Sequence, residues 1–111
     1  MATAIKREVK TITDTVNGSA TKVVDSIALA QLCAIQYWVC LYNETENKYK
    51  TFQLFAKKKS STQVGDILRG KSGGPIDLDV FFNINGVNAE LSFVNNESYN
   101  VEVDIKKIVL P

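Results

Sequence analysis

The chain has 111 residues, of which 45% are hydrophobic and 23% are charged, and its formal net charge is +1. These values are typical of one globular domain and exclude the disordered and membrane-spanning classes. Because the sequence contains no histidine, it also excludes Ser-His-Asp and Cys-His nucleophile systems, His-ligated zinc and the commonest general base at neutral pH. A nearly neutral chain lacks the basic surface that binds phosphate backbones, so we expect no nucleic-acid partner.

The first twenty residues contain no aromatic side chain. We therefore expect an N-terminal arm over residues 1–20, followed by a domain over residues 21–111. An apolar stripe recurs in the arm at the spacing of a helix face, and we expect it to make assembly contacts: Ile5, Val9, Ile12 and Val16. A helix over this stripe would have Gly18 as its C-cap.

The same segment also carries a pattern typical of a strand. Three β-branched threonines occupy every second position, at Thr11, Thr13 and Thr15. Helix and strand both remain open for residues 5–16. The next apolar segment, Ser26–Leu32, is short and rich in alanine, and we expect extended chain there.

The clearest strand is predicted over Ile35–Tyr42, where both alternating faces are largely apolar. Such a strand belongs in the middle of a sheet. The polar segment 43–47 predicts a turn, and the alternation over Lys48–Ala56 predicts a second strand that completes an antiparallel hairpin. The aromatic residues of this hairpin could form a platform for stacking sugars, but such residues more often belong to a core: Trp38, Tyr42, Tyr49 and Phe52.

Two polar segments follow this hairpin. Lys57, Lys58 and Lys59 could contact phosphate or an acidic surface, although a solvated loop or the protection of a sheet edge explains them as well. Residues 65–72 match the letter pattern of a phosphate-binding loop, from Gly65 to Ser72. The context does not fit, because Gly73, Gly74 and Pro75 stand where a helix would have to begin. We expect a flexible turn there.

A second hairpin is predicted over residues 76–94. Asn85 and Gly86 lie between two alternating segments and favour a type I′ turn. Asp77 and Asp79 share one face of its first strand and could form an acid–base pair or ligate calcium, but two carboxylates on a solvent face are common by chance. The last strand is predicted over Tyr99–Leu110, with apolar and polar faces that alternate cleanly.

The remaining observations concern metals, disulfides and targeting. Cys33 and Cys40 are seven residues apart, an odd separation that places them on opposite faces of a strand, so we expect no bridge between them. With no further soft ligands, they also predict no metal site. We expect no cofactor. The first residues lack the apolar stretch of a signal peptide, and no apolar run is long enough for a membrane helix.

Several strand patterns resemble a module of the virion structural proteins of tailed bacteriophages. The matching segments lie within residues 21–109 and are Thr21–Ser26, Ala34–Val39, Tyr49–Ala56, Val87–Phe93 and Val101–Val103. The chain departs from the family pattern after Lys48–Ala56, the second strand of the first hairpin. The family has a histidine there, and this chain has the run Lys57, Lys58 and Lys59. The resemblance implies a β-sandwich present in many copies on a capsid, neck, tail or fibre, without catalytic residues to carry over.

Together these observations predict an all-β fold, an antiparallel β-sandwich of jelly-roll or Ig-like type with an N-terminal arm. The expected function is that of a non-enzymatic structural component of a phage particle, made in the host cytoplasm. Its expected partners are copies of itself and other virion proteins, with no membrane. The alternative is a carbohydrate- or receptor-binding sandwich that uses exposed aromatic residues such as Trp38 and Tyr42.

Overall fold

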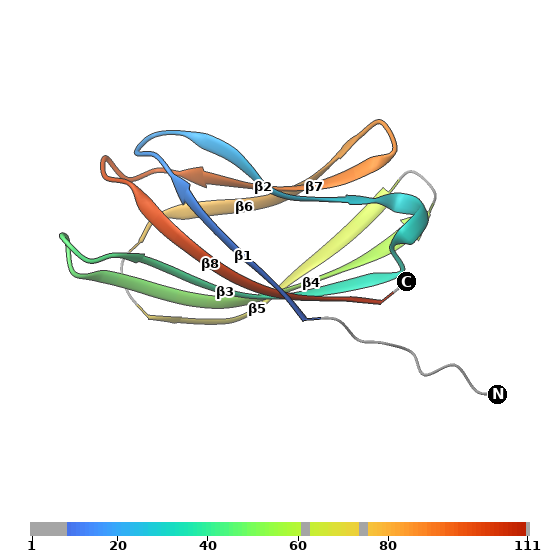
Figure 1. Cartoon of the computed structure of the whole chain (residues 1–111), viewed down its shortest axis with the longest axis horizontal. Helices are drawn as coiled ribbons and strands as arrows, with labels where there is room; N and C mark the ends of the chain where they lie inside the picture. Colours follow the sequence, from blue (N-terminus) through green and yellow to red (C-terminus); the bar gives the residue numbers. More distant parts are fainter. Residues whose placement is uncertain (1–8, 61–62, 74–75, 111) are drawn as a thin grey trace.

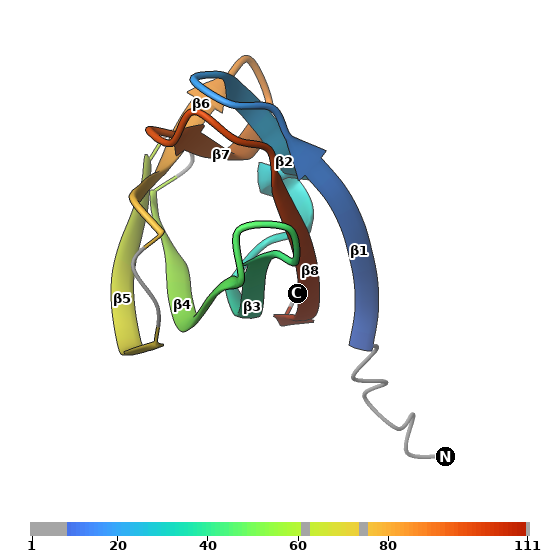
Figure 2. The same ribbon diagram turned by 90° about the vertical axis from the view of Figure 1, so that its left-hand side faces the viewer.

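The computed structural model describes residues 9–60, 63–73 and 76–110, and this part of the chain is almost entirely β-structure. Two antiparallel sheets pack face to face (Figures 1 and 2). The predicted all-β sandwich is therefore confirmed. Over the same ranges, no helix has the length and apolar character needed to span a membrane.

The larger sheet has five strands, with β3 in the middle as its two apolar faces predicted. In spatial order these strands are β1 (Val9–Val16), β8 (Val101–Leu110), β3 (Ala34–Asn43), β4 (Lys48–Ser60) and β5 (Gln63–Gly73). The smaller sheet contains β2 (Thr21–Ala28), β7 (Asn88–Asn95) and β6 (Leu78–Asn85).

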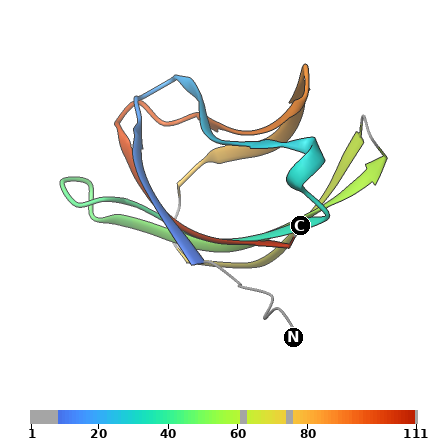
Figure 3. The same ribbon diagram turned by 45° about the vertical axis from the view of Figure 1, so that its right-hand side comes forward.

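The connections decide between the two predicted sandwich types. β1 pairs with β8 in one sheet, and β2 pairs with β7 in the other. In the Ig order the first two strands share a sheet, so this topology is closer to a jelly roll. A 3₁₀ turn, η1 (Leu29–Gln31), carries the chain from β2 to β3 (Figure 3). The expectation of continuous extended chain to Leu32 was wrong at this turn.

The N-terminal segment is a strand wherever the structure describes it. Val9–Val16 pairs with β8 without interruption. Along the predicted stripe, Val9 is 57% exposed, Ile12 is half-buried and Val16 is fully buried, whereas Ile5 lies outside the described residues. The domain boundary after residue 20 and the assembly role of the stripe remain predictions.

Gly18 lies in the loop between β1 and β2 and is not a helix C-cap. A Cβ atom at this position would lie 2.4 Å from the carbonyl oxygen of Ser98. The glycine is therefore required because two loops approach each other closely. Its N–H donates a hydrogen bond to the Asn100 side chain across the same approach.

The core lies between the two sheets and follows the predicted alternation. In β3, Ile35, Tyr37, Val39 and Leu41 are buried, whereas the residues between them are more exposed. The inward residues of the other strands include Phe52, Leu54, Leu91, Phe93, Val101, Val103 and Ile105. A core of this kind, built from period-two faces, is what the sequence pattern indicated.

Two predictions of local structure were wrong. Residues 63–73 form β5, paired with β4, where a flexible turn was expected; the pairing supplies backbone hydrogen bonds that override the local preference of the glycines. The second hairpin does turn at Gly86, but Asn85 pairs with Asn88, and within this loop, all of which the structure describes, Gly86 alone has positive φ (62°). Such a loop matches a type II′ turn, with glycine at its first central position.

A buried ion pair connects the sheets. The Lys107 ammonium on β8 lies 2.8 and 2.9 Å from the two carboxylate oxygens of Asp25 on β2, and the two side chains are 10% and 8% exposed. The Tyr37 hydroxyl donates a hydrogen bond of 2.7 Å to the same carboxylate. Burial, and then the Asp25 charge, raise the pKa of Tyr37 far above its usual value, so the phenol remains a donor.

A buried amide connects the loops at one end of the sandwich. Asn95 is 1% exposed, and its side-chain N–H groups donate to the carbonyls of Val16, Asn17 and Tyr99 at 3.1, 3.2 and 2.8 Å. Its side-chain oxygen accepts from the N–H of Glu97. One side chain thus satisfies carbonyls from both the β1–β2 and β7–β8 connections.

Candidate functional site on the outer face of the large sheet

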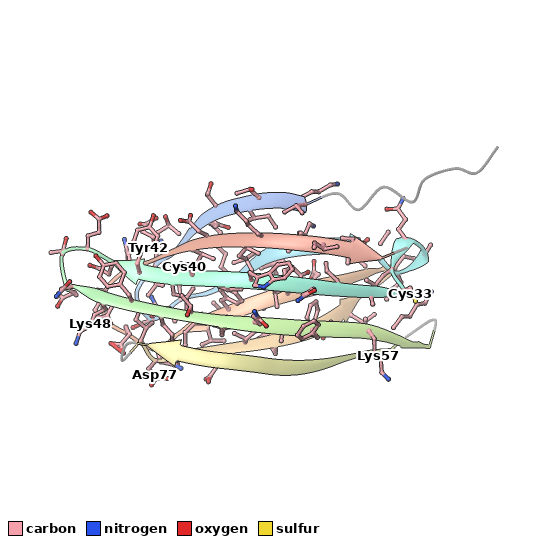
Figure 4. All side chains as sticks on the ribbon, turned by 90° about the horizontal axis from the view of Figure 1, so that it is seen from below. Cys33, Cys40, Tyr42, Lys48, Lys57 and Asp77 are labelled. Carbon is pink, nitrogen blue, oxygen red and sulfur yellow. The ribbon has the colours of Figure 1, made fainter. Side chains whose placement is uncertain are left out.

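The lysine run does not form one patch in the structure. It lies within β4, not in a loop, so neighbouring lysines point to opposite faces. Lys57 is exposed (Figure 4), whereas Lys58 is half-buried and its ammonium donates to the Leu29 carbonyl at 3.0 Å. The side chain of Lys59 lies outside the described residues. The proposed surface contact would therefore rest on Lys57.

The two aspartates of the second hairpin lie close enough to share one partner. The Asn96 side-chain amide donates to Asp77 at 3.3 Å and to Asp79 at 3.1 Å, and all three residues are exposed. Over the described ranges, no group of three or more His, Cys, Asp or Glu side chains is arranged to hold a metal. The pair is thus explained by its bridging amide.

The aromatic residues of the first hairpin divide between the two faces of the large sheet. Phe52 is buried in the core, whereas Trp38 and Tyr42 lie half-buried on the outer face and Tyr49 is exposed there. Tyr42 and Tyr49 are stacked, with ring centroids 6.5 Å apart and planes 15° apart. The structure therefore brings three of the four candidate aromatic residues onto one solvent-facing surface.

Strand register arranges this surface in rows that cross four strands, because directly opposed residues of antiparallel strands point to the same face. Figure 4 looks onto this face, with Cys40 and Tyr42 along β3. One row, from β1 to β4, consists of Thr11, Lys106, Trp38 and Gln53. The next row consists of Thr13, Asp104, Cys40 and Thr51.

We call the hollow over these two rows the outer groove. It has a volume of about 660 Å³ and is lined by the eight residues of the two rows, together with Val39, Phe52 and Ile105, which lie between the rows and direct their side chains into the core. A second hollow of about 330 Å³ adjoins it at Thr13 and Asp104 and extends to Tyr42 and Glu102. The surface combines an aromatic ring with hydroxyl, amide, carboxylate and ammonium groups.

Burial and nearby carboxylates raise the pKa of two titratable groups on this face. Burial, and then the charge of Asp104, raise the pKa of the Cys40 thiol, which keeps it protonated and a poor nucleophile at neutral pH. The charge of Asp104, then burial and the charge of Glu102, raise the pKa of Tyr42. The face can therefore offer hydrogen-bond donors and acceptors together with an aromatic surface.

The sequence pattern indicates the aromatic residues of the outer groove but not its polar ones. Lys106 and Asp104 belong to the polar face of the predicted last strand, and Thr11 and Thr13 to the predicted arm. Gln53 and Thr51 carried no signal of their own. Period-two alternation gives the face of each residue, but only the order β1-β8-β3-β4 makes these residues neighbours.

Comparison with known proteins supports the fold. No family model and no curated protein sequence matches the chain. Among solved structures, the tailspike protein of Acinetobacter baumannii phage AM24 aligns with 93% of this chain and 26% of its own at 11% identity, with a TM-score of 0.56. The tailspike protein of Acinetobacter phage vB_ApiP_P1 aligns with 98% of this chain and 23% of its own, also at 11% identity, with a TM-score of 0.46.

The chain therefore spans about a quarter of the length of these tailspike chains. At 11% identity, the likeness to the first of them concerns the fold alone. It agrees with the expectation, from the strand patterns in the sequence, that this sandwich resembles modules of phage virion proteins.

Proposed function

We propose that this chain is a non-enzymatic structural module of a phage tail, acting through contacts with copies of itself and with other virion proteins. The observation that carries the proposal is the fold likeness to the AM24 phage tailspike over 93% of the chain. The strand patterns of the sequence point to the same class of particle. In this role the sandwich is a rigid unit whose outward surfaces do the work.

A virion component must purify with particles. Mass spectrometry of density-purified particles, from cells that carry the gene and produce the phage, should detect this chain at multiple copies per particle. A free host enzyme of known abundance serves as the control for carry-over. If the chain remains with the free proteins while intact tailed particles form without it, the virion role is wrong.

The outer groove favours a second candidate function, the binding of a glycan. A ring such as that of Trp38 offers an apolar face to the C–H groups of a sugar, while nearby polar side chains can bind its hydroxyls. Trp38 has Gln53 and Lys106 directly opposite it on the neighbouring strands. This arrangement has the mixed apolar and polar character of small-molecule sites.

Trp38 is the single tryptophan of the chain, so tryptophan emission, excited at a wavelength that the four tyrosines do not absorb, reports on the outer groove. If a glycan binds there, titration with host surface oligosaccharides should shift this emission, and Trp38→Ala should weaken binding by about tenfold or more, as measured by calorimetry. Phe81→Ala is the matched control, because Phe81 is an exposed aromatic residue of β6 in the smaller sheet. Equal losses in both variants, or an emission that does not respond, would count against the glycan site.

A further inference from the structure

The outer edge of β1 is open among the residues that the structure describes. β1 is the last strand on one side of the large sheet (Figure 2) and pairs only with β8 in that sheet. The edge of a strand presents N–H and C=O groups that can pair with another strand. Natural proteins usually protect such edges with prolines, bulges or inward-pointing charges.

β1 lacks two of these protections, proline and a bulge, and its inward-facing charges, Lys10 and Asp14, lie opposite Lys107 and Val103 of the inner face. Its register with β8 is uninterrupted over eight residues, and the strand contains no proline. By contrast, the edge strand β2 has a register irregularity between Val23 and Asp25. Val9, near the start of β1, is 57% exposed.

The contacts of β1 indicate which of its residues face the open edge. Every second residue of an antiparallel edge strand directs its N–H and C=O away from its partner. The Thr15 carbonyl accepts a hydrogen bond of 3.4 Å from Lys22, which lies on β2 and not on β8. This places Thr15, and with it Thr13, Thr11 and Val9, in the outward-bonding set. Because the Thr15 N–H also donates to the Asp14 side chain, both groups of Thr15 are bonded within the chain, and the outward groups of Val9, Thr11 and Thr13 are the ones left for a second strand.

The charges of β1 match those of a second copy. In an antiparallel pairing of two β1 strands centred on Ile12, Lys10 of each copy lies opposite Asp14 of the other. The same register places Thr11 opposite Thr13, so the outward-bonding threonines pair with each other. Opposite charges and threonines at such positions stabilise strand pairs.

The side chains are in a state to make these contacts. Lys10 is exposed, and Ile12 is half-buried with a surface that its counterpart would cover. Burial acts to raise the pKa of Asp14, but hydrogen bonds from Lys22 and from the Thr15 N–H outweigh it and lower that pKa. Its carboxylate is therefore charged at neutral pH. The edge strand β6 carries a single charged residue, Asp79, and offers no such self-complementary pair.

We infer that two copies of this chain associate through their β1 edges, antiparallel and centred on Ile12, to form one continuous sheet. The inference rests on the proposed function for its premise that the chain works in multiple copies, and it names the strand and the ion pairs that join them. The two-fold axis would pass between the two Ile12 residues, perpendicular to the sheet.

Charge exchange tests this register. In analytical ultracentrifugation, the wild type should show a concentration-dependent dimer, and K10D and D14K should each weaken it by about tenfold, because like charges then face each other twice. An equimolar mixture of K10D and D14K should recover the dimer, because each introduced charge then faces an opposite one. The double variant K10D/D14K should recover it alone.

K22S is the matched control. It removes the Lys22 partner of Asp14 within the chain but leaves the inferred contact, so the dimer should persist. Circular dichroism checks that every variant is folded. K10D keeps the test decisive should D14K lose stability, since Lys10 is exposed.

Two results would overturn the inference: a wild type that stays monomeric up to millimolar concentration, or a dimer that K10D does not weaken and the mixture does not recover. Neither result decides the proposed function. A virion role is settled separately, by whether the chain purifies with particles.

Discussion

Replacing Lys107 with methionine should lower the free energy of unfolding by about 3–5 kcal/mol, because the buried carboxylate of Asp25 then loses its counter-charge. The two charged groups are in bidentate contact, are about nine-tenths buried, and join opposite sheets. The hydrogen bond from Tyr37 cannot replace a positive charge. Urea denaturation, compared at equal m-values, measures the loss.

Lys106→Met is the matched control, because Lys106 is the preceding residue on the exposed face of the same strand. We expect it to change stability by less than about 0.5 kcal/mol. The double variant Asp25→Leu/Lys107→Met should recover much of the loss, since removing both charges also removes the cost of burying them. If Lys107→Met lowered the free energy of unfolding no more than Lys106→Met does, the buried pair would contribute little to stability.

Asn95→Asp should destabilise the sandwich by on the order of 3 kcal/mol at neutral pH, because it replaces a donating amide with a carboxylate. The new oxygen would face the carbonyls of Val16, Asn17 and Tyr99, which would lose their donor. The carbonyl of Val16 would then be buried without a partner, and those of Asn17 and Tyr99 would be left unpaired in part-buried positions. Thermal and urea unfolding measure the effect.

The pH dependence of the Asn95→Asp penalty follows from the direction in which folding shifts the pKa of the introduced carboxyl. Burial and the facing carbonyls raise the pKa of the introduced carboxyl in the folded state above its unfolded value. The penalty is therefore present above the folded-state pKa and is relieved as the pH falls through it, because the protonated acid can donate again. Asn83→Asp, at an exposed position of β6, places its charge opposite Glu90, so we expect only a small loss of less than about 1 kcal/mol and a correspondingly small recovery at low pH. A penalty in Asn95→Asp that does not change with pH would contradict the donor role.

The buried ion pair of Lys107 and Asp25 shows what period-two alternation can and cannot predict. The clean alternation predicted for the last strand included no buried charge, yet the face of Val101, Val103 and Ile105 continues by the same period to Lys107, which is buried in the structure. The sequence also does not say which residue meets that charge. Asp25 is 82 residues away, and its sheet is fixed only by the pairing of β2 with β7.

For the outer groove too, the sequence predicted part of the arrangement and the tertiary structure decided the rest. The sequence indicated that Trp38, Cys40 and Tyr42 share a face and that this strand is central. It could not decide whether that face is core or surface, because both faces of the strand are largely apolar. The structure decides it by packing the smaller sheet against the other face, which carries Tyr37, Val39 and Leu41.

Composition and the absence of histidine in 111 residues bounded the chemistry of this protein, and period-two patterns determined its fold class and most of its strands. These are local properties, since the face of a residue depends only on its position along its own strand. The choice of strand for residues 9–16, the strand at 63–73, the outer groove and the open edge of β1 were decided by the tertiary structure alone. Each depends on which strand lies beside which, and this is set by long-range pairing and by the burial of one face against the other sheet.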